Sequence, residues 1–336
     1  MIKKLLILLL ALNINAAAQT TAKLLNEKPA LIPMPQQIEW KKERLAIKNY
    51  KGIIVKSDSL HKDAELLQKQ LKELGLIIPI KKGTAANEPS IILELGKVNI
   101  PDSTPEAYKL SITANAITIT GAGKAGVFYG LQTLKQLIDA DKNVTACNIT
   151  DWPSFSWRGS MIDAGRNYQP MDLLKQQIDF IAAYKLNIFH FHFTEDIAWR
   201  LESKLYPQLT APETMLRNKG KFYTQNDLQE LISYCKARHI TLVPEIDMPG
   251  HSAAFKRAMK TDMQSDSGLA IVKNILKEFC DTFDVPYLHI GADEVKITNK
   301  NFLPEVISLV EKQGKKVIEW EPGGEFTEST IRQLWM

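Results

Sequence analysis

The sequence predicts a protein of the α/β class, with a parallel sheet in its C-terminal half and a small mixed domain before it. Beyond residue 157, short apolar segments alternate with stretches of helical spacing, which is typical of parallel βα units. Carboxylates cluster directly after these apolar segments. Ligand sites form at the carboxyl ends of parallel strands both in a (β/α)8 barrel and in an open α/β sheet, so the pattern alone leaves both architectures open.

The composition is that of an ordinary globular protein. The chain has 336 residues, of which 45% are hydrophobic and 24% charged, and this argues against a disordered, collagen-like or multi-spanning membrane protein. A net charge of +4 gives no reason to expect nucleic acid or an anionic membrane as a partner. The three cysteines show no zinc spacing, and an odd number does not make a disulfide framework, so we expect them to be small buried apolar residues.

The N-terminus has the three parts of a secretory signal. Lys3 and Lys4 precede an apolar run over residues 5–12, and small residues then lead to Gln19. The run is too short to cross a bilayer, so we predict a signal peptide over residues 1–18 and export to the periplasm or the medium. A buried N-terminal helix is the alternative. Because no second apolar stretch reaches spanning length, no membrane span is expected.

Residues 31–150 are predicted to form a small α+β domain. Apolar alternation and spacing predict helices at 61–74 and 127–138 and strands at 53–55, 77–80, 91–95, 108–113 and 116–120. Ala114 and Asn115 have the character of a hairpin turn between the last two strands. No convergent set of polar side chains occurs in this region, so we expect it to act as a scaffold.

Residues 157–336 are predicted to form the second, larger domain. Strands are expected at 160–164, 187–193, 241–246, 287–292, 316–320 and 332–335, and helices at 171–184, 226–238, 269–283 and 304–313. Charged side chains lie at or just after the strand ends, and they are Asp163, Arg166, Glu195, Asp196, Glu245, Asp247, Asp293, Glu294, Glu319 and Glu321. Parallel strands bring such ends to one edge of a sheet, which makes this edge the candidate site.

The strongest chemical signal is the pair of adjacent carboxylates, Asp293 and Glu294. Two neighbouring acids compete for ionisation, and the charge of one raises the pKa of the other. A raised pKa suits a general acid, whose proton must still be present near neutral pH. Gly291 and Ala292 leave room for a ligand close to the backbone. A solvated acidic pair on a loop is the alternative interpretation.

Three histidines accompany the acid pair. Alternation over residues 187–193 places His190 and His192 on the face opposite the phenylalanines, toward the interior of a barrel. There they would either bind a metal or support the site through hydrogen bonds. Two prolines and Gly250 fix the loop that presents His251, whose alternative role is to cap the following helix.

Aromatic rings favour a carbohydrate as the ligand. Trp320 and Trp335 close successive predicted strands, and a sugar can lay its apolar C–H face on such a ring. Trp199 is a further candidate, for which we favour packing in the core.

Four segments in the same order resemble the family 20 glycoside hydrolases, the β-N-acetylhexosaminidases, and most of all their exported bacterial members. The segments are residues 157–166, 190–200, 244–251 and 289–295. Residues 126–134 also resemble the end of the N-terminal α/β domain of that family, so the similarity runs from about residue 31 to the last residue. The resemblance implies a (β/α)8 barrel of the TIM type behind the small domain.

The resemblance also implies exo-acting hydrolysis of terminal β-linked N-acetylhexosamine, with retention of configuration. Glu294 would protonate the glycosidic oxygen and then activate water. Asp293 would orient the 2-acetamido group, whose carbonyl oxygen attacks the anomeric carbon. Such substrate-assisted catalysis needs no enzymic nucleophile, and two acids that are neighbours in sequence suit it.

The binding residues follow from the same resemblance. Arg166 and Glu195 would hold sugar hydroxyls, His251 would support the acid, and Trp320 and Trp335 would line the acetamido pocket. The resemblance implies no metal and no other cofactor, and the partner is a glycan that contains N-acetylhexosamine.

Two features depart from the family pattern. Glu195 and Ala292 replace an aspartate and a glycine that are usual in the family, and the longer acid leaves the choice between N-acetylglucosamine and N-acetylgalactosamine open. Residues 157–336 supply six predicted strands, whereas a complete barrel usually takes about 250 residues. We therefore expect a barrel that lacks its last two βα units. The alternative function is a catalytically impaired, carbohydrate-binding remnant of the same family.

Overall fold

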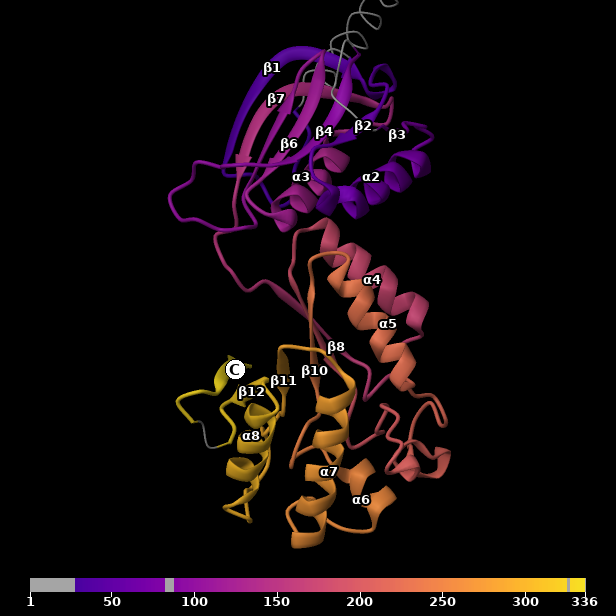
Figure 1. Ribbon diagram of the computed structural model, residues 1–336. Coiled ribbons are helices and arrows are strands. Elements are labelled where there is room, and N and C mark those ends of the chain that lie inside the picture. Colours follow the sequence, from indigo (N-terminus) through magenta and orange to yellow (C-terminus); the bar gives the residue numbers. More distant parts are fainter. Residues whose placement is uncertain (1–27, 82–87, 325–326, 336) are drawn as a thin grey trace, which may run out of the picture. The chain divides into compact units, whose positions relative to one another are not determined.

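The computed structural model describes residues 28–81, 88–324 and 327–335. The chain divides into two compact units, Met1–Pro153 and Ser154–Met336, which are coloured indigo to magenta and magenta to yellow in Figure 1. The predicted signal peptide lies outside the described residues. Within the described ranges, no helix combines the length and the apolar character needed to cross a membrane.

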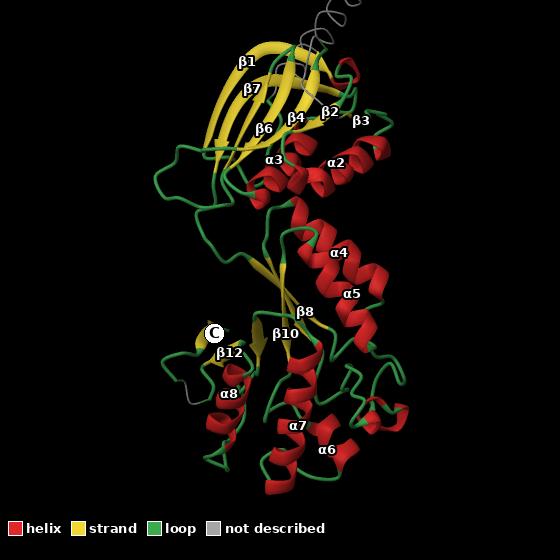
Figure 2. Cartoon of the chain, in the orientation of Figure 1, coloured by secondary structure: helices red, strands yellow, loops and turns green. Residues whose placement is uncertain are grey.

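The first unit is a seven-stranded mixed sheet with two helices. The strands lie in the order β1-β7-β5-β6-β4-β2-β3, and both helices pack against the sheet and each other (Figure 2). The bounds are β1 Gln37–Ala46, β2 Ile53–Val55, α2 His61–Glu73, β3 Ile80–Lys81, β4 Ser90–Leu95, β5 Tyr108–Ile112, β6 Ala116–Gly121, α3 Lys124–Leu137 and β7 Asn143–Asp151. The predicted hairpin is present, since β5 and β6 pair antiparallel.

Two strands of this unit were not predicted, and they form its longest antiparallel pair. β1 pairs with β7 from Gln37 opposite Thr150 to Ala46 opposite Asn143, with a register irregularity between Trp40 and Arg44. β1 lies at the edge of the sheet, and most of its side chains are exposed or half-buried. An edge strand tolerates a polar sequence such as this one, so the usual apolar alternation of a strand is missing.

The second unit is built on six parallel strands that follow one another in chain order. The strands are β8 Gly159–Asp163, β9 Ile188–His192, β10 Thr241–Glu245, β11 Tyr287–His289, β12 Lys316–Glu321 and β13 Ile331–Leu334, and each bonds to the next. The helices are α4 Met171–Ala183, α5 Gln225–Lys236, α6 Ala253–Met259, α7 Asp266–Thr282 and α8 Phe302–Lys312. This is the arrangement of an incomplete TIM-type barrel. It confirms the predicted fold class, and α6 is the helix that the sequence pattern did not reveal.

The strands separate two environments. Phe189 and Phe191 of β9 stack on each other at 5.8 Å, while His190 and His192 face the carboxylate of Glu245 on β10. The predicted alternation along β9 is therefore correct. Toward the amino ends of the strands the core is apolar, with Ile188, Val243 and Ile318 in contact. Polar side chains thus occupy the carboxyl end of the same sheet.

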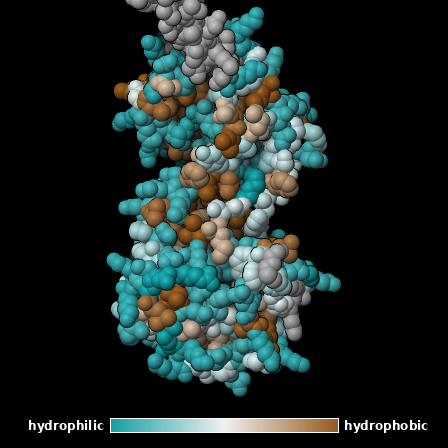
Figure 3. Space-filling view, turned by 180° about the vertical axis from the view of Figure 1, so that it is seen from behind, coloured by the Kyte–Doolittle hydropathy of each residue, from teal (hydrophilic) through white to brown (hydrophobic). Residues whose placement is uncertain are grey.

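The outer strands of the second unit are less covered than the middle ones. Among the described residues, β8 pairs only with β9, and β13 only with β12. Met161 of β8 is 40% exposed, and Phe180 of α4 is 64% exposed. Figure 3 shows brown hydrophobic areas on one face of a mostly hydrophilic surface. The well-packed middle strands are the ones that carry the acid pair and its partners.

The cysteines behave largely as small apolar residues. Cys147 and Cys235 are buried, Cys280 is half-buried, and all three are free thiols. Burial raises the pKa of the Cys235 thiol to about 12, so it stays protonated and unreactive at neutral pH.

Candidate active site

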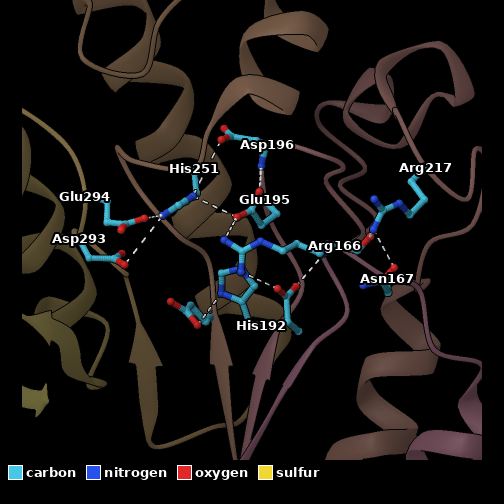
Figure 4. Close-up of polar contacts among 12 residues, drawn as sticks. Arg166, Asn167, His192, Glu195, Asp196, Arg217, His251, Asp293 and Glu294 are labelled. Carbon is cyan, nitrogen blue, oxygen red and sulfur yellow. Dashed lines mark hydrogen bonds and ion pairs between the residues drawn. The ribbon is translucent and has the colours of Figure 1, made fainter. Parts of the chain in front are cut away.

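The loops after four successive strands bring five of the predicted site residues together. Arg166 follows β8, Glu195 follows β9, His251 follows β10, and Asp293 and Glu294 follow β11. Figure 4 shows their side chains pointing toward one another from these different loops. This edge of the sheet is where parallel strands end, so the local sequence motifs converge because of the strand direction.

A continuous chain of polar contacts joins these side chains. The imidazole of His251 lies 3.4 Å from Glu294 through Nε2 and 3.0 Å from Glu195 through Nδ1. Glu195 also pairs with the guanidinium of Arg166, whose Nη1 contacts Asp163 Oδ2 at 2.7 Å. Glu294 is therefore connected through His251 and Glu195 to Arg166, the predicted sugar-binding residue.

The position of Glu195 differs from its predicted role. We expected this carboxylate to hold sugar hydroxyls, yet its side chain is only 2% exposed and already contacts His251, Arg166 and the backbone N–H of Asp196. Burial favours its neutral form, but hydrogen bonding to His251 and the charge of Arg166 hold the pKa of Glu195 below its usual value. In contrast, the Arg166 side chain is 49% exposed and open to a ligand.

His251 is held in its charged form. Its hydrogen bond to Glu195 raises the pKa of His251 to about 9, although burial works in the opposite direction. The backbone of His251 has a φ of +43°, in the left-handed region that a residue with a side chain rarely adopts. This backbone conformation is strained, and it places the cationic ring of His251 between the carboxylates of Glu195 and Glu294.

The stability of the protein is expected to depend on His251 between pH 6.5 and 9. Because the folded pKa lies above the usual value of 6.5, the contribution of His251 is complete below pH 6.5 and is lost as the pH rises through about 9. It amounts to at most about 3 kcal/mol. Urea unfolding of wild type and His251→Gln across this range measures it, since His192 titrates in both proteins. A difference in unfolding free energy that does not change with pH would contradict this assignment.

The acid pair lies on a strained loop. Asp293 is largely buried, with 13% of its side chain exposed, whereas the Glu294 side chain is 55% exposed. The backbones of Ala292 and Glu294 have φ values of +76° and +49°, and that of Gly291 has +72°. Burial is the largest cause that raises the pKa of Asp293, and the neighbouring charge of Glu294, which the sequence suggested as the cause, ranks lower.

Gly291 is required for a second reason besides its backbone angle. A Cβ atom at this position would lie 1.7 Å from Oδ1 of Asp247. No side chain can be accommodated there without moving one of the two loops. The loop that carries the acid pair therefore rests directly on Asp247.

A buried carboxylate forms the floor beneath the site. Glu245 is fully buried, and its oxygens lie 2.8 Å from His190 Nε2, 2.6 Å from His192 Nδ1 and 3.3 Å from His289 Nδ1. Trp320 Nε1 donates a hydrogen bond of 2.8 Å to the same carboxylate. One anion on β10 thus contacts side chains from three other strands, β9, β11 and β12.

The protonation states of Glu245 and the three histidines around it, which we call the floor of the site, depend on one another. Burial favours the neutral acid, but the facing histidines hold the pKa of Glu245 well below its usual value. Burial also opposes the charged form of His192, yet the Glu245 carboxylate raises the pKa of His192 to about 9. Burial lowers the pKa of His289, which is therefore neutral. An ion pair between Glu245 and His192 lies at the centre of the floor.

The metal alternative for the histidines can be compared with these contacts. His190, Glu245 and His289 offer ligand atoms within 4.8 Å of one another, as do His192, Glu245 and Asp247. His190 and His192 already meet the Glu245 oxygens at 2.8 and 2.6 Å, and Nδ1 of His289 accepts a hydrogen bond from the Gly291 N–H at 3.1 Å. Contacts within the protein therefore explain the spacing of these side chains. The geometry favours the supporting role for His190 and His192.

The three tryptophans have separate places. Trp320 is 8% exposed and packs on the ring of His289 at 4.6 Å, so it belongs to the interior above the floor. Trp335 is 38% exposed, and its Nε1 donates to the carbonyl of Pro322 at 2.9 Å. Trp199 is 3% exposed and donates to the Leu201 carbonyl, which confirms its interpretation as a core residue.

Several functional residues escaped the sequence analysis. Glu245 and Asp247 were noted only as strand-end carboxylates, and His289 was not singled out, although all three lie at the centre of the site. Arg217 also supports the site, because its Nη1 donates to Asn167 Oδ1 at 2.9 Å beside Arg166 (Figure 4). Pro244 and Pro249 flank Glu245 and Asp247 and restrict the backbone there. This restriction was the sequence feature that could have identified the two acids as site residues.

The fold and the site define a class of protein. A barrel of parallel βα units with adjacent acids at the strand ends and a tryptophan beside them is typical of a glycoside hydrolase. Residues 155–268 and 256–333 match the model of the glycosyl hydrolase family 20 catalytic domain, and residues 28–152 match domain 2 of that family. The chain belongs to glycosyl hydrolase family 20, which confirms the resemblance inferred from the sequence.

Similar proteins include named β-hexosaminidases. The chain is 29% identical to the β-hexosaminidase of Porphyromonas gingivalis over 353 residues, covering 87% of this chain and 45% of that protein. It is also 29% identical to the β-hexosaminidase of Vibrio furnissii over 372 residues, covering 91% of this chain and 60% of the other. The chain thus spans about half the length of these relatives.

Solved structures share the fold. The GH20 exo β-N-acetylglucosaminidase from Vibrio harveyi, in complex with N-acetylglucosamine, matches with a TM-score of 0.83 at 25% identity, covering 92% of this chain and 58% of that chain. The GH20 β-N-acetylhexosaminidase from Streptomyces coelicolor matches with a TM-score of 0.82 at 28% identity, covering 92% and 71%. Both matches cover most of this chain, so they extend over both of its units.

Proposed function

We propose that the protein hydrolyses terminal β-linked N-acetylhexosamine as an exo-acting, retaining β-N-acetylhexosaminidase. The observation that carries this proposal is the contact of Glu294 with His251 at the strand ends, with Asp293 beside it on the same loop. The named relatives support the substrate class. Because the chain covers less than two thirds of those relatives, activity of this chain belongs to the proposal.

The reaction proceeds in two steps. Glu294 gives its proton to the glycosidic oxygen while the carbonyl oxygen of the 2-acetamido group bonds to the anomeric carbon, and the leaving alcohol departs. Water then attacks the same carbon, loses a proton to Glu294 and opens the oxazolinium ring. Two inversions at one carbon return the β configuration. Asp293 accepts a hydrogen bond from the acetamido N–H and stabilises the positive charge on the ring.

Binding and positioning are divided among the remaining side chains. The half-exposed guanidinium of Arg166 holds sugar hydroxyls, while Glu195 orients Arg166 and His251 and does not itself meet the sugar. His251 fixes the direction of Glu294 from one side. Trp320 provides an apolar wall for the acetamido methyl group. Trp335 lines the outer part of the pocket.

Hydrolysis of nitrophenyl glycosides tests the proposed function. The protein should release nitrophenol from the β-N-acetylglucosaminide or the β-N-acetylgalactosaminide, and proton NMR should show the β anomer of the product first. The β-glucoside, which lacks the acetamido nucleophile, should remain intact. Unchanged turnover with a chelator present would separate this mechanism from a metal-dependent one. Sugar binding by calorimetry without turnover would instead support a carbohydrate-binding remnant.

Export is a separate proposal that rests on the N-terminal pattern. We infer that residues 1–18 are removed during secretion to the periplasm or the medium. N-terminal sequencing of the protein isolated from each cell fraction tests this. Recovery of the intact N-terminus from the cytoplasm alone would overturn it.

A further inference from the structure

Asp247 is a buried acid that the proposed mechanism does not use. It follows β10, is 1% exposed, and its Oδ1 has no hydrogen-bond partner among the described residues. Its backbone N–H donates to Thr194 Oγ1 at 2.9 Å, which fixes the loop. The same Oδ1 lies against the backbone of Gly291, where a Cβ atom would approach to 1.7 Å.

A second carboxyl oxygen without a partner lies close by. Oδ1 of Asp293 is buried and has no hydrogen-bond partner in the described part of the chain. Ligand atoms of Asp247, His251 and Asp293 all lie within 4.8 Å of one another. Two carboxyl groups this close in a buried site cannot both be ionised at low cost, so one of them retains a proton.

The surroundings decide which acid keeps the proton. Burial and the charges of Glu245 and Asp293 disfavour an anionic Asp247, whereas His192 and His251 act in the opposite direction, and the net effect raises the pKa of Asp247 well above its usual value. The guanidinium of Arg166 is the other cation within electrostatic reach. Asp293 is more exposed and has His251 at 3.9 Å, so it is the better anion.

We propose that Asp247 remains protonated and donates a hydrogen bond to the carboxylate of Asp293, directly or through one water. It is a positioning residue, because it aims Asp293 at the acetamido group without touching the sugar. The inference rests on the proposed function, in which Asp293 meets that group. According to this inference, the acid that keeps a proton beside Asp293 is Asp247, in the loop after β10.

Asp247→Asn and Asp247→Ala separate this role from an anionic or purely structural one. Asparagine keeps the shape and an N–H donor, so kcat should stay within about 5-fold of wild type. Alanine removes the donor to a charged acceptor, so kcat should fall by about 10- to 100-fold while KM changes little. Asp284→Asn, at a surface acid with 93% of its side chain exposed, is the matched control.

Binding of a sugar-fused thiazoline, a stable copy of the oxazolinium ring, gives a readout independent of turnover. Its affinity should fall for Asp247→Ala by the same factor as kcat and hold for Asp247→Asn, while affinity for free N-acetylglucosamine stays within about 3-fold in both. An Asn variant as impaired as the Ala variant, or an Ala variant with wild-type kcat, overturns the inference.

The design also separates this inference from the proposed function. A wild-type protein that neither turns over substrate nor binds the thiazoline overturns both. If the wild type binds the thiazoline and Asp247→Asn does not, the proposed role of Asp247 is wrong while the proposed function stands. If the Ala variant does not fold, the Asn variant decides by itself, since an anionic role predicts its failure and a donor role predicts its activity.

Discussion

Glu294→Gln is expected to lower kcat by about 10²- to 10⁴-fold, because glutamine cannot give a proton to the departing oxygen. The Glu294 side chain is 55% exposed, so the substitution should leave the fold intact. The loss should be larger for a disaccharide, whose alcohol needs protonation, than for a nitrophenyl glycoside, whose phenolate departs unaided. Steady-state kinetics with both substrates measures the difference.

A matched substitution controls for charge. Glu305→Gln removes a half-buried acid of α8 that pairs with Lys273 of α7, away from the site, and it should leave kcat unchanged. The assignment of Glu294 fails if Glu294→Gln has the kcat of wild type. It also fails if the loss is equal for the two leaving groups, because a general acid must distinguish them.

Glu245→Leu is expected to destabilise the protein by about 3–5 kcal/mol, the usual cost of removing one partner from a buried ion pair. His192 then loses its nearest carboxylate, and His190, His192 and the Trp320 indole lose the acceptor they share. For a unit of this size the melting temperature should fall by about 10 °C. Thermal unfolding followed by circular dichroism measures it.

The pH dependence of the stability loss in Glu245→Leu distinguishes a lost ion pair from lost packing. Because the raised pKa of His192 depends on Glu245, the deficit should be largest below pH 6.5 and shrink as the pH rises through about 9. Glu245→Gln keeps the shape and one acceptor, so it should be less destabilised than Glu245→Leu. A deficit that does not vary with pH would indicate lost packing instead of a lost ion pair.

The sequence predicted those parts of the protein that local patterns determine. The parallel strands of the second unit are short apolar runs between helical stretches, so the sequence pattern revealed them. In β9, for example, every residue is buried. β1 escaped because an edge strand with exposed side chains lacks that signal. Glu294 and His251 were found because each lies in a compact motif fixed by glycine or proline.

The floor and the true partners of Glu195 could not be predicted in this way. His190 and Glu245 are 55 residues apart, and no local spacing relates them. Likewise, a carboxylate after a strand can meet a ligand or a neighbouring loop with equal ease. Only the assembled sheet shows that Glu195 faces His251 and Arg166. Contacts between loops are set by tertiary packing, which is why single motifs did not reveal them.

The chain of contacts from Arg166 through Glu195 and His251 to Glu294 implies that sugar binding and proton affinity are thermodynamically linked. In the proposed function, a sugar hydroxyl that binds the Arg166 guanidinium would compete with Glu195 for it, and Glu195 would then attract the proton of His251 more strongly. By reciprocity, whatever sugar binding does to the protonation of the site, protonation does to sugar affinity. If the proposed function holds, sugar binding at Arg166 would therefore change the protonation of the side chains around Glu294 before any bond is broken.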